Sequence, residues 1–168
     1  TDWTRIGRAT REQMAGKLPK ATKRAREALI RAVHFLKDLG VHNHRLLPYS
    51  MQLVGLAAFF SECRKPTKAQ VEFLKRWFWV TSFTGWFSIG NPSRVRHLVE
   101  ELRDDIAHAS EPKDMKCVDL KQPALPFPST FDMRSSRTRT LLCMMVAHAP
   151  LSHDGTAIEE PWKSIKEY

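Results

Sequence analysis

The sequence predicts an all-α protein, an irregular bundle of about five helices with a proline-rich crossing before the last helix. Apolar residues recur at steps of three and four in several segments, which is the spacing of helix faces that pack on a core. No segment alternates apolar and polar residues for long enough to indicate a sheet. Prolines cluster between residues 111 and 130, where they interrupt regular structure.

Length and composition indicate one domain with a real core. The chain has 168 residues, 42% of them hydrophobic, with five Trp and nine Phe. The longest apolar run, residues 53–60, is far shorter than the roughly 20 residues that span a bilayer, so no membrane contact is expected. Three widely separated cysteines, Cys63, Cys117 and Cys143, indicate neither a disulfide framework nor a zinc site. A reducing, cytoplasmic location is therefore expected.

The first helix is expected from Lys20 to Gly40. Residues 1–19 form a basic segment with the breakers Gly16 and Pro19, and at most a frayed helix is expected there. After Lys20 an amphipathic stripe appears, and Gly40 suits a left-handed cap that ends it. The stripe consists of Ala25, Leu29, Ala32, Val33, Leu36 and Leu39.

Two helices are expected in the middle of the chain. Residues 48–61 are apolar nearly all round, which places this helix at the centre of the bundle, with Pro48 in its first turn. Thr67 and Gln70 form a capping box that begins the next helix, and Gly85 ends it. The buried stripe of that helix comprises Val71, Leu74, Trp77, Phe78 and Thr81.

The last two helices are separated by the proline-rich crossing at residues 111–130. Asn91 as N-cap and Pro92 as first residue begin the fourth helix. Its inner stripe is expected to be Val95, Leu98, Val99, Leu102 and Ile106, with Glu100, Glu101, Asp104 and Asp105 facing water. The fifth helix is expected at residues 137–148, before Pro150, with Leu141, Leu142, Met145 and Val146 inward. The helical domain is thus residues 20–150, and residues 151–168 form a tail that hangs free or leads to a missing C-terminal domain.

Aromatic residues are expected mainly in the core. The aromatic rings of Trp77-Phe78-Trp79 and Trp86-Phe87 could stack on the bases of single-stranded nucleic acid. Aromatic residues at helical spacing are, however, far more often part of the core. Trp79 is the exception, because it points away from the buried stripe. We expect a partner domain to cover it. The expected structural core includes Pro48, Tyr49, Phe59, Trp77, Phe78, Phe83 and Phe87.

The positive charge is concentrated at one end. Of the net +9, residues 1–37 contribute ten Lys or Arg against three acids, and the remaining 131 residues have 17 against 15. Such a segment is either an electrostatic footprint for DNA or a solvated basic arm. If it binds DNA, the affinity should depend little on the DNA sequence and should fall as the salt concentration rises. The candidate DNA-binding residues are Arg5, Arg8, Arg11, Lys17, Lys20, Lys23, Arg24 and Arg26.

No complete catalytic, metal or cofactor site is found. His42 and His44 lie two residues apart without further ligands at suitable spacing. Asp104, Asp105 and His108 fit an acidic helix end better than an acid–base pair. Cys63 precedes Arg64 and Lys65, which could lower the pKa of its thiol, but no histidine is near in sequence. No glycine-rich phosphate loop is present.

With the helices placed, a series of short segments resembles a known family. Their order resembles the helical region of GmrSD-type, modification-dependent restriction proteins, whose N-terminal domain has a ParB/sulfiredoxin-like nucleotidase fold. The resemblance covers most of residues 20–158. It rests on Leu46-Leu47-Pro48-Tyr49, Leu53-Val54, residues 56–60, Arg76-Trp77-Phe78-Trp79, Phe83, Phe87-Ser88, Phe131-Asp132-Met133, residues 137–146, Pro150 and Asp154-Gly155.

The resemblance implies a place between two catalytic domains of a phage-defence nuclease. In that family the helical region follows a nucleotide-hydrolysing domain with a Gly-Gln-Gln-Arg-type motif and often precedes an HNH nuclease, and neither signature occurs here. The chain would then be a non-catalytic module that positions or couples those domains and contacts DNA. One departure is Trp86-Phe87-Ser88, where the family commonly has Arg-Tyr-Ser. The alternative is a stand-alone helical interaction or nucleic-acid-binding protein.

Overall fold

The computed structural model describes residues 8–88, 91–126 and 129–163, with side-chain surroundings from residue 15 onward. Within these ranges the chain is helical and contains no strand, so the all-α prediction is confirmed. Five α-helices form an irregular bundle: α1 (Arg8–Asp38), α2 (Ser50–Glu62), α3 (Lys68–Phe83), α4 (Pro92–Glu101) and α5 (Ser136–Ala147). Short 3-10 turns are η2 (His44–Leu46), η3 (Trp86–Ser88) and η5 (Pro161–Lys163), and η4 (Leu102–Ile106) is a π-helical turn that prolongs α4.

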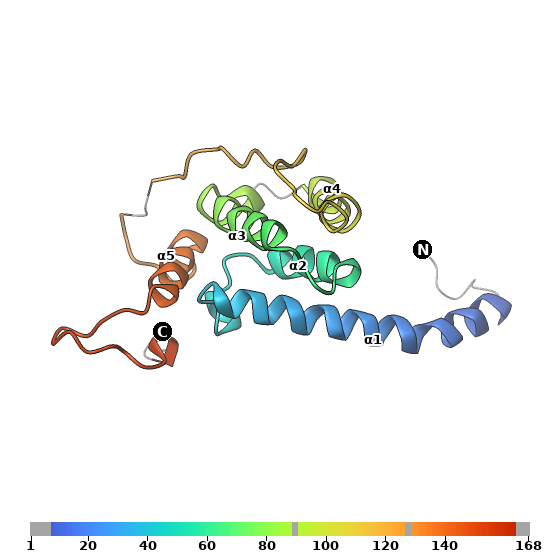
Figure 1. Ribbon diagram of the computed structural model, residues 1–168, viewed down its shortest axis with the longest axis horizontal. Helices are drawn as coiled ribbons and strands as arrows, with labels where there is room; N and C mark the ends of the chain where they lie inside the picture. The colour runs from blue at the N-terminus through green and yellow to red at the C-terminus, as the bar shows by residue number, and fades with distance from the viewer. Residues whose placement is uncertain (1–7, 89–90, 127–128, 164–168) are drawn as a thin grey trace.

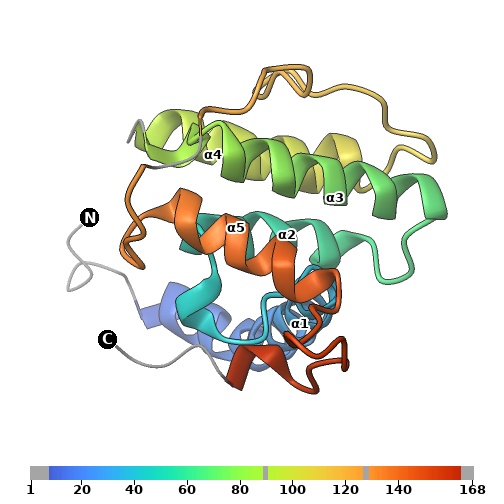
Figure 2. The same ribbon diagram turned by 90° about the vertical axis from the view of Figure 1, so that its left-hand side faces the viewer.

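The helices are arranged around α2. Figure 1 shows α1 along one side of α2, with α3 and α4 on the other side and α5 near the C-terminal end of α1. The N-terminal part of α1 extends beyond the bundle (Figure 1). In the view of Figure 2 the crossing between α4 and α5 runs over the outer side of α3 and α4. None of the helices in the described ranges is long and apolar enough to cross a membrane.

Helix α1 differs from the sequence prediction in two ways. It is continuous for 31 residues through Gly16 and Pro19, so the expected boundary at residue 20 lies inside a helix. Good helix formers around Pro19 offset the roughly 3 kcal/mol that an interior proline costs. The expected stripe is also only partly buried: Ala32, Leu36 and Leu39 are inside, but Ala25, Leu29 and Val33 are exposed. The remaining buried positions are Ala28 and Phe35.

The end of α1 and the C-terminal half of α5 meet closely. Gly40 has φ +82°, as a left-handed cap requires, which confirms the expected end of the helix. A Cβ at this position would lie 2.1 Å from the carbonyl oxygen of Cys143. Glycine is therefore needed both for the backbone conformation and for the approach of α5.

The core draws buried side chains from all five α-helices and from the crossing. Phe59, Trp77 and Phe78 are fully buried, and Pro48 is buried as expected. Pro48 does not lie in the first turn of α2, because the helix begins one residue after the N-cap Tyr49. The other expected core aromatics, Tyr49, Phe83 and Phe87, are partly buried.

Helix α3 follows its prediction most closely. Thr67 and Gln70 form the expected capping box, and Gly85 with φ +66° follows the end of the helix. Trp79 is partly buried within the chain itself, where its ring stacks on Phe83 at 6.0 Å between centroids. Part of Trp79 is therefore covered by its own chain, and cover of the remainder by a partner domain stays a prediction.

Helix α4 begins as predicted, but one of the acidic residues expected to face water is buried. Asn91 caps the helix through Ser93 and Arg94, and Pro92 is its first residue. Glu101, expected to face water, is buried and belongs to the packing between α4 and the crossing. The crossing at residues 111–130 has no helix in its described part, as predicted, and Met115, Val118 and Leu120 anchor it to the core.

Helix α5 exists as predicted but buries a different face. Its buried residues are Thr138, Thr140 and Cys143, whereas Met145, expected inside, is 52% exposed. Small side chains suit this face because α5 approaches Gly40 closely, and the Cys143 thiol donates to the carbonyl oxygen of Leu46 at 3.1 Å.

The tail also differs from its prediction. Leu151 pairs with Ala157 in an isolated antiparallel bridge, and the indole of Trp162 stacks on the imidazole of His42 at 3.6 Å. Residues 151–157 are exposed in a loop that projects from the bundle (Figure 1), but the chain then returns, and Trp162 packs against the core instead of hanging free.

Candidate nucleic-acid interface

A basic side of α1 is the strongest candidate for a functional surface. Lys17, Lys20 and Lys23 recur every three residues, and Arg24 follows directly, so helical geometry brings all four to the same side of α1. All four side chains are exposed. Within the part of the chain that the structure describes, the three lysines form no ion pair. Their ammonium groups are thus available to an anionic partner.

Arg24 is held in place by the end of α2. Its guanidinium donates to the carboxylate of Glu62 at 3.0 Å and to the carbonyl oxygen of Ser61 at 3.4 Å. An exposed ion pair of this kind contributes little to stability. It does restrict where the guanidinium lies, and it joins the basic side of α1 to the C-terminal end of α2.

The turn between α2 and α3 adds two cations that the sequence analysis did not assign to this surface. Arg64 pairs with Glu27 of α1 at 3.6 Å, and Lys65 is exposed beside it. The sequence shows Arg64 and Lys65 as a basic pair in a turn. Assigning that pair to this surface requires knowing that α1 and α2 lie side by side. We call Lys17, Lys20, Lys23, Arg24, Arg64 and Lys65 the basic surface.

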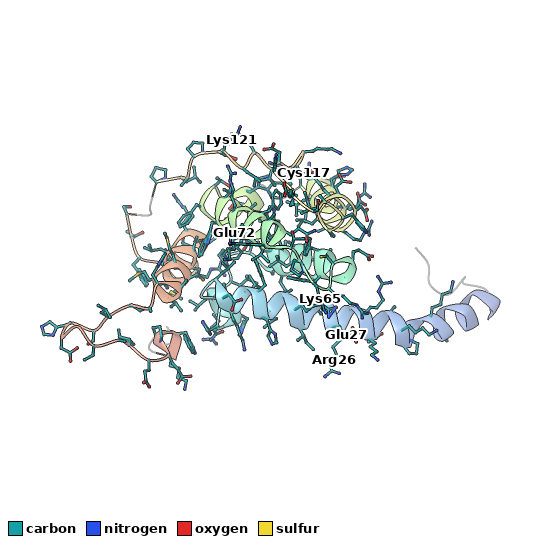
Figure 3. The ribbon with its side chains drawn as sticks, in the orientation of Figure 1. Arg26, Glu27, Lys65, Glu72, Cys117 and Lys121 are labelled. Atoms are coloured by element: carbon teal, nitrogen blue, oxygen red, sulfur yellow. The ribbon has the colours of Figure 1, made fainter. Side chains whose placement is uncertain are left out.

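The eight predicted DNA-binding residues do not form one surface. Lys17, Lys20, Lys23 and Arg24 lie within about a third of the helix circumference, whereas Arg26 lies about half a turn round the helix from Lys17. Figure 3 shows Arg26 projecting away from the bundle. Arg8 and Arg11 belong to α1, but their side chains lie outside the described residues, and Arg5 lies outside them altogether.

The electrostatics of the basic surface favour an anion. Among the described side chains, two of the six cations pair with a carboxylate, Arg24 with Glu62 and Arg64 with Glu27. Because the groups are in contact with water, each pair is screened and no single one dominates. A surface of this kind is suited to an extended polyanion, which would be held through several weak contacts.

The described residues place no third potential metal ligand beside the histidine pair His42 and His44. His42 stacks on Trp162, and the pKa of its imidazole is lowered, first by burial and then by the charge of Lys37. Asn43 caps η2 through the backbone N–H of Arg45. No group of three or more potential metal ligands occurs among the described residues.

The cysteines are also poor candidates for chemistry. Burial raises the pKa of the Cys63 thiol despite the neighbouring Arg64 and Lys65, so the expected lowering is not found. The pKa of Cys117 is raised to about 11 by burial and by its hydrogen bond with Glu101. Burial likewise raises the pKa of Cys143 to about 12. All three thiols are thus protonated near neutral pH and weakly nucleophilic.

Glu101 has a structural task that its sequence neighbourhood did not indicate. Its two carboxylate oxygens accept the backbone N–H groups of Lys116 and Cys117, the latter at 3.0 Å. These contacts satisfy a carboxylate that is otherwise buried, and they tie the crossing to the end of α4.

The chain matches no family model, no curated protein and no solved structure at a significant level.

Proposed function

We propose that this chain is a non-catalytic helical module of a larger restriction-type nuclease and that it contacts the DNA backbone through the basic surface. The observation that carries the DNA contact is the row of Lys17, Lys20 and Lys23 on a helix that extends beyond the bundle. The place in a nuclease rests on the resemblance of the Leu-Pro-Tyr and Trp-Phe-Trp segments to the helical region of GmrSD-type proteins.

The contact would be to phosphates and not to base edges. Sequence readout needs donors and acceptors held rigidly in a groove, whereas exposed lysines present a mobile point charge. Such contacts position a protein on DNA without reading it. Recognition of a modified base would then belong to another domain of the parent protein.

A charge-reversal experiment tests the DNA contact. Binding of the full chain to two unrelated duplexes is measured by fluorescence anisotropy at several salt concentrations. The variant Lys20→Glu/Lys23→Glu is compared with Lys113→Glu/Lys121→Glu, which makes the same change in net charge at exposed lysines of the crossing. The first variant should lower the slope of log K against log salt by about 0.9 for each phosphate that the protein no longer neutralises.

Two results would contradict the proposal. Equal weakening by both variants would mean that only net charge matters. A large difference between the two duplexes would mean that the chain reads sequence.

The same preparations should leave DNA and nucleoside triphosphates uncleaved. The described residues contain no group of three or more His, Cys, Asp or Glu side chains that could hold a metal ion, and the pair of His97 and Glu100, 3.5 Å apart, is exposed on the surface of α4. Cleavage that a point mutation in this chain abolishes would show a catalytic site and refute the non-catalytic role.

A further inference from the structure

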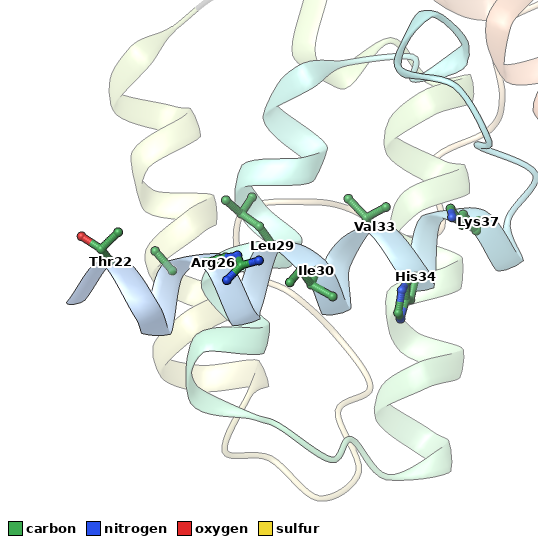
Figure 4. Close-up of a pocket in the computed structure, with 8 residues that line it drawn as sticks. Thr22, Arg26, Leu29, Ile30, Val33, His34 and Lys37 are labelled. Carbon is green, nitrogen blue, oxygen red and sulfur yellow. The ribbon is translucent and has the colours of Figure 1, made fainter. Parts of the chain in front are cut away.

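Helix α1 also carries an exposed apolar stripe, and Lys23 of the basic surface borders it, in a pocket shared with Leu18 and Thr22. Leu18, Leu29, Ile30 and Val33 are 64%, 42%, 45% and 40% exposed. Leu29, Ile30 and Val33, together with Ala25 and Thr22, line an open groove of about 450 Å³. Figure 4 shows Leu29, Ile30 and Val33 side by side along α1, with Arg26 and Lys37 at either end of the row.

The stripe continues a seam that already binds helices within the chain. Ala32, Leu36 and Leu39 are buried and follow each other at steps of four and three residues. The same alternation runs backward to Leu29, Ala25, Thr22 and Leu18, which are exposed. Steps of three and four define the face by which one helix packs on another. The exposed half of the seam thus has the shape of a helix-docking site.

The charge around the groove determines which helix fits. Its polar lining consists of Arg26, His34, Lys37 and the hydroxyl of Thr22, and no carboxylate lines it. We infer that the stripe binds an amphipathic α-helix of a partner protein that has an apolar face and acidic residues on both flanks. Glutamates at those flanking positions would lie opposite Arg26 and Lys37, as charged residues do beside the apolar seam of a coiled coil.

A second copy of this chain fits less well. Pairing two α1 stripes would bring Arg26 and Lys37 of both copies into one interface, and like charges across an interface are destabilising. DNA fits less well too, because a phosphate backbone gains nothing from Leu29, Ile30 and Val33. The inference is independent of the proposed DNA contact, because it rests on exposed apolar side chains and not on the lysines of the basic surface.

Two synthetic peptides test the inference. Each has about 20 residues, enough for a stable helix, with leucines at the apolar heptad positions. One peptide carries Glu and the other Lys at the flanking positions. Binding of each labelled peptide to the full chain is measured by fluorescence anisotropy. The acidic peptide should bind, and the basic peptide should bind at least about tenfold more weakly.

Three variants locate the binding site. Leu29→Gln/Val33→Gln should weaken the acidic peptide about tenfold or more, since interface energy concentrates in a few buried apolar anchors. Val54→Gln is the matched control, because Val54 of α2 is 44% exposed and does not line this groove. Arg26→Glu/Lys37→Glu should reverse the preference, so that the basic peptide binds more tightly. Circular dichroism verifies that each variant is folded.

Five results would overturn the inference. The acidic peptide fails to bind, or both peptides bind equally. Val54→Gln weakens binding as much as the stripe variant does. Lys20→Glu/Lys23→Glu abolishes peptide binding, which would assign it to the basic surface. Sedimentation shows a dimer that Leu29→Gln/Val33→Gln dissociates, which would make a second copy the occupant.

Discussion

The side-chain amide of Gln52, in the first turn of α2, donates to the hydroxyl of Ser82 near the end of α3 at 2.8 Å. The same amide nitrogen lies 3.0 Å from the hydroxyl oxygen of Thr81 and 3.2 Å from the carbonyl oxygen of Phe78. The amide oxygen of Gln52 accepts the backbone N–H of Tyr49. One fully buried side chain therefore accepts a free backbone N–H at the beginning of α2 and joins that end of the helix to the last turn of α3.

Replacing Gln52 should destabilise the bundle. Gln52→Ala leaves several buried polar groups without partners and opens a small cavity, so the free energy of unfolding should fall by about 2–4 kcal/mol. Urea denaturation followed by circular dichroism measures the change. Gln122→Ala, at an exposed position of the crossing, should be neutral. A neutral Gln52→Ala would mean that water replaces the amide without cost.

Trp77 should be a structural anchor. Its side chain is fully buried between α2 and α3, and Trp77→Ala should cost about 3–5 kcal/mol. That loss is comparable to the whole stability of a modest domain, so the variant should be unfolded or nearly so. Phe131→Ala removes an aromatic ring that is 68% exposed and should change the melting temperature little. A cooperative, equally stable Trp77→Ala protein would contradict the buried position.

Glu101 should control how firmly the crossing is held. Glu101→Ala removes the acceptor for the backbone N–H groups of Lys116 and Cys117, so local opening of the crossing should become about tenfold more frequent. Trypsin cleavage at Lys116 and Lys121 under native conditions measures that opening. Glu100→Ala, in the same helix but away from those two N–H groups, is the matched control. Equal cleavage of both variants would show that Glu101 does not hold the crossing.

The stack of His42 on Trp162 should depend on pH. Burial and the charge of Lys37 lower the pKa of His42 below its usual 6.5, so the folded state takes up the proton less readily than the unfolded state. Stability should therefore be complete above pH 6.5 and decrease as the pH falls through 6.5 toward the lowered value. His42→Phe keeps a ring against Trp162 without a titrating group and should remove this part of the pH dependence. Thermal unfolding of both proteins between pH 5 and 7.5 measures the difference, and identical profiles would contradict it.

Features that depend on neighbouring residues were predictable from the sequence. The Thr67–Gln70 capping box and the Asn91–Pro92 start each need only a few consecutive residues, and both occur as expected. Gly40 and Gly85 likewise end their helices with positive φ. Local hydrogen bonding and backbone sterics decide these features, so they can be recognised without the tertiary fold.

Features that depend on what packs against a helix were not predictable. Periodicity identified an apolar face on α1 but not how much of it α2 covers, so Leu29 and Val33 were wrongly placed inside. Glu101 was placed in water because its partners lie 15 and 16 residues away in the crossing. For the candidate site, the concentration of basic residues in the sequence identified Lys17, Lys20, Lys23 and Arg24. Arg64 was missed because its link to Glu27 exists only after α1 and α2 pair.

The last prediction separates the two parts of the basic N-terminal region. Deleting residues 1–16 removes Arg5, Arg8 and Arg11 and leaves Lys17, Lys20 and Lys23 in place. If those arginines also meet phosphates, both the affinity for DNA and the slope of its logarithm against log salt should fall, by about 0.9 in slope for each phosphate left without its arginine. Because the arginines and the lysines would act on separate phosphates, the deletion and Lys20→Glu/Lys23→Glu should have additive effects on the slope. Unchanged affinity and slope after the deletion would show that residues 1–16 are a solvated arm and that the lysines of α1 alone bind the DNA.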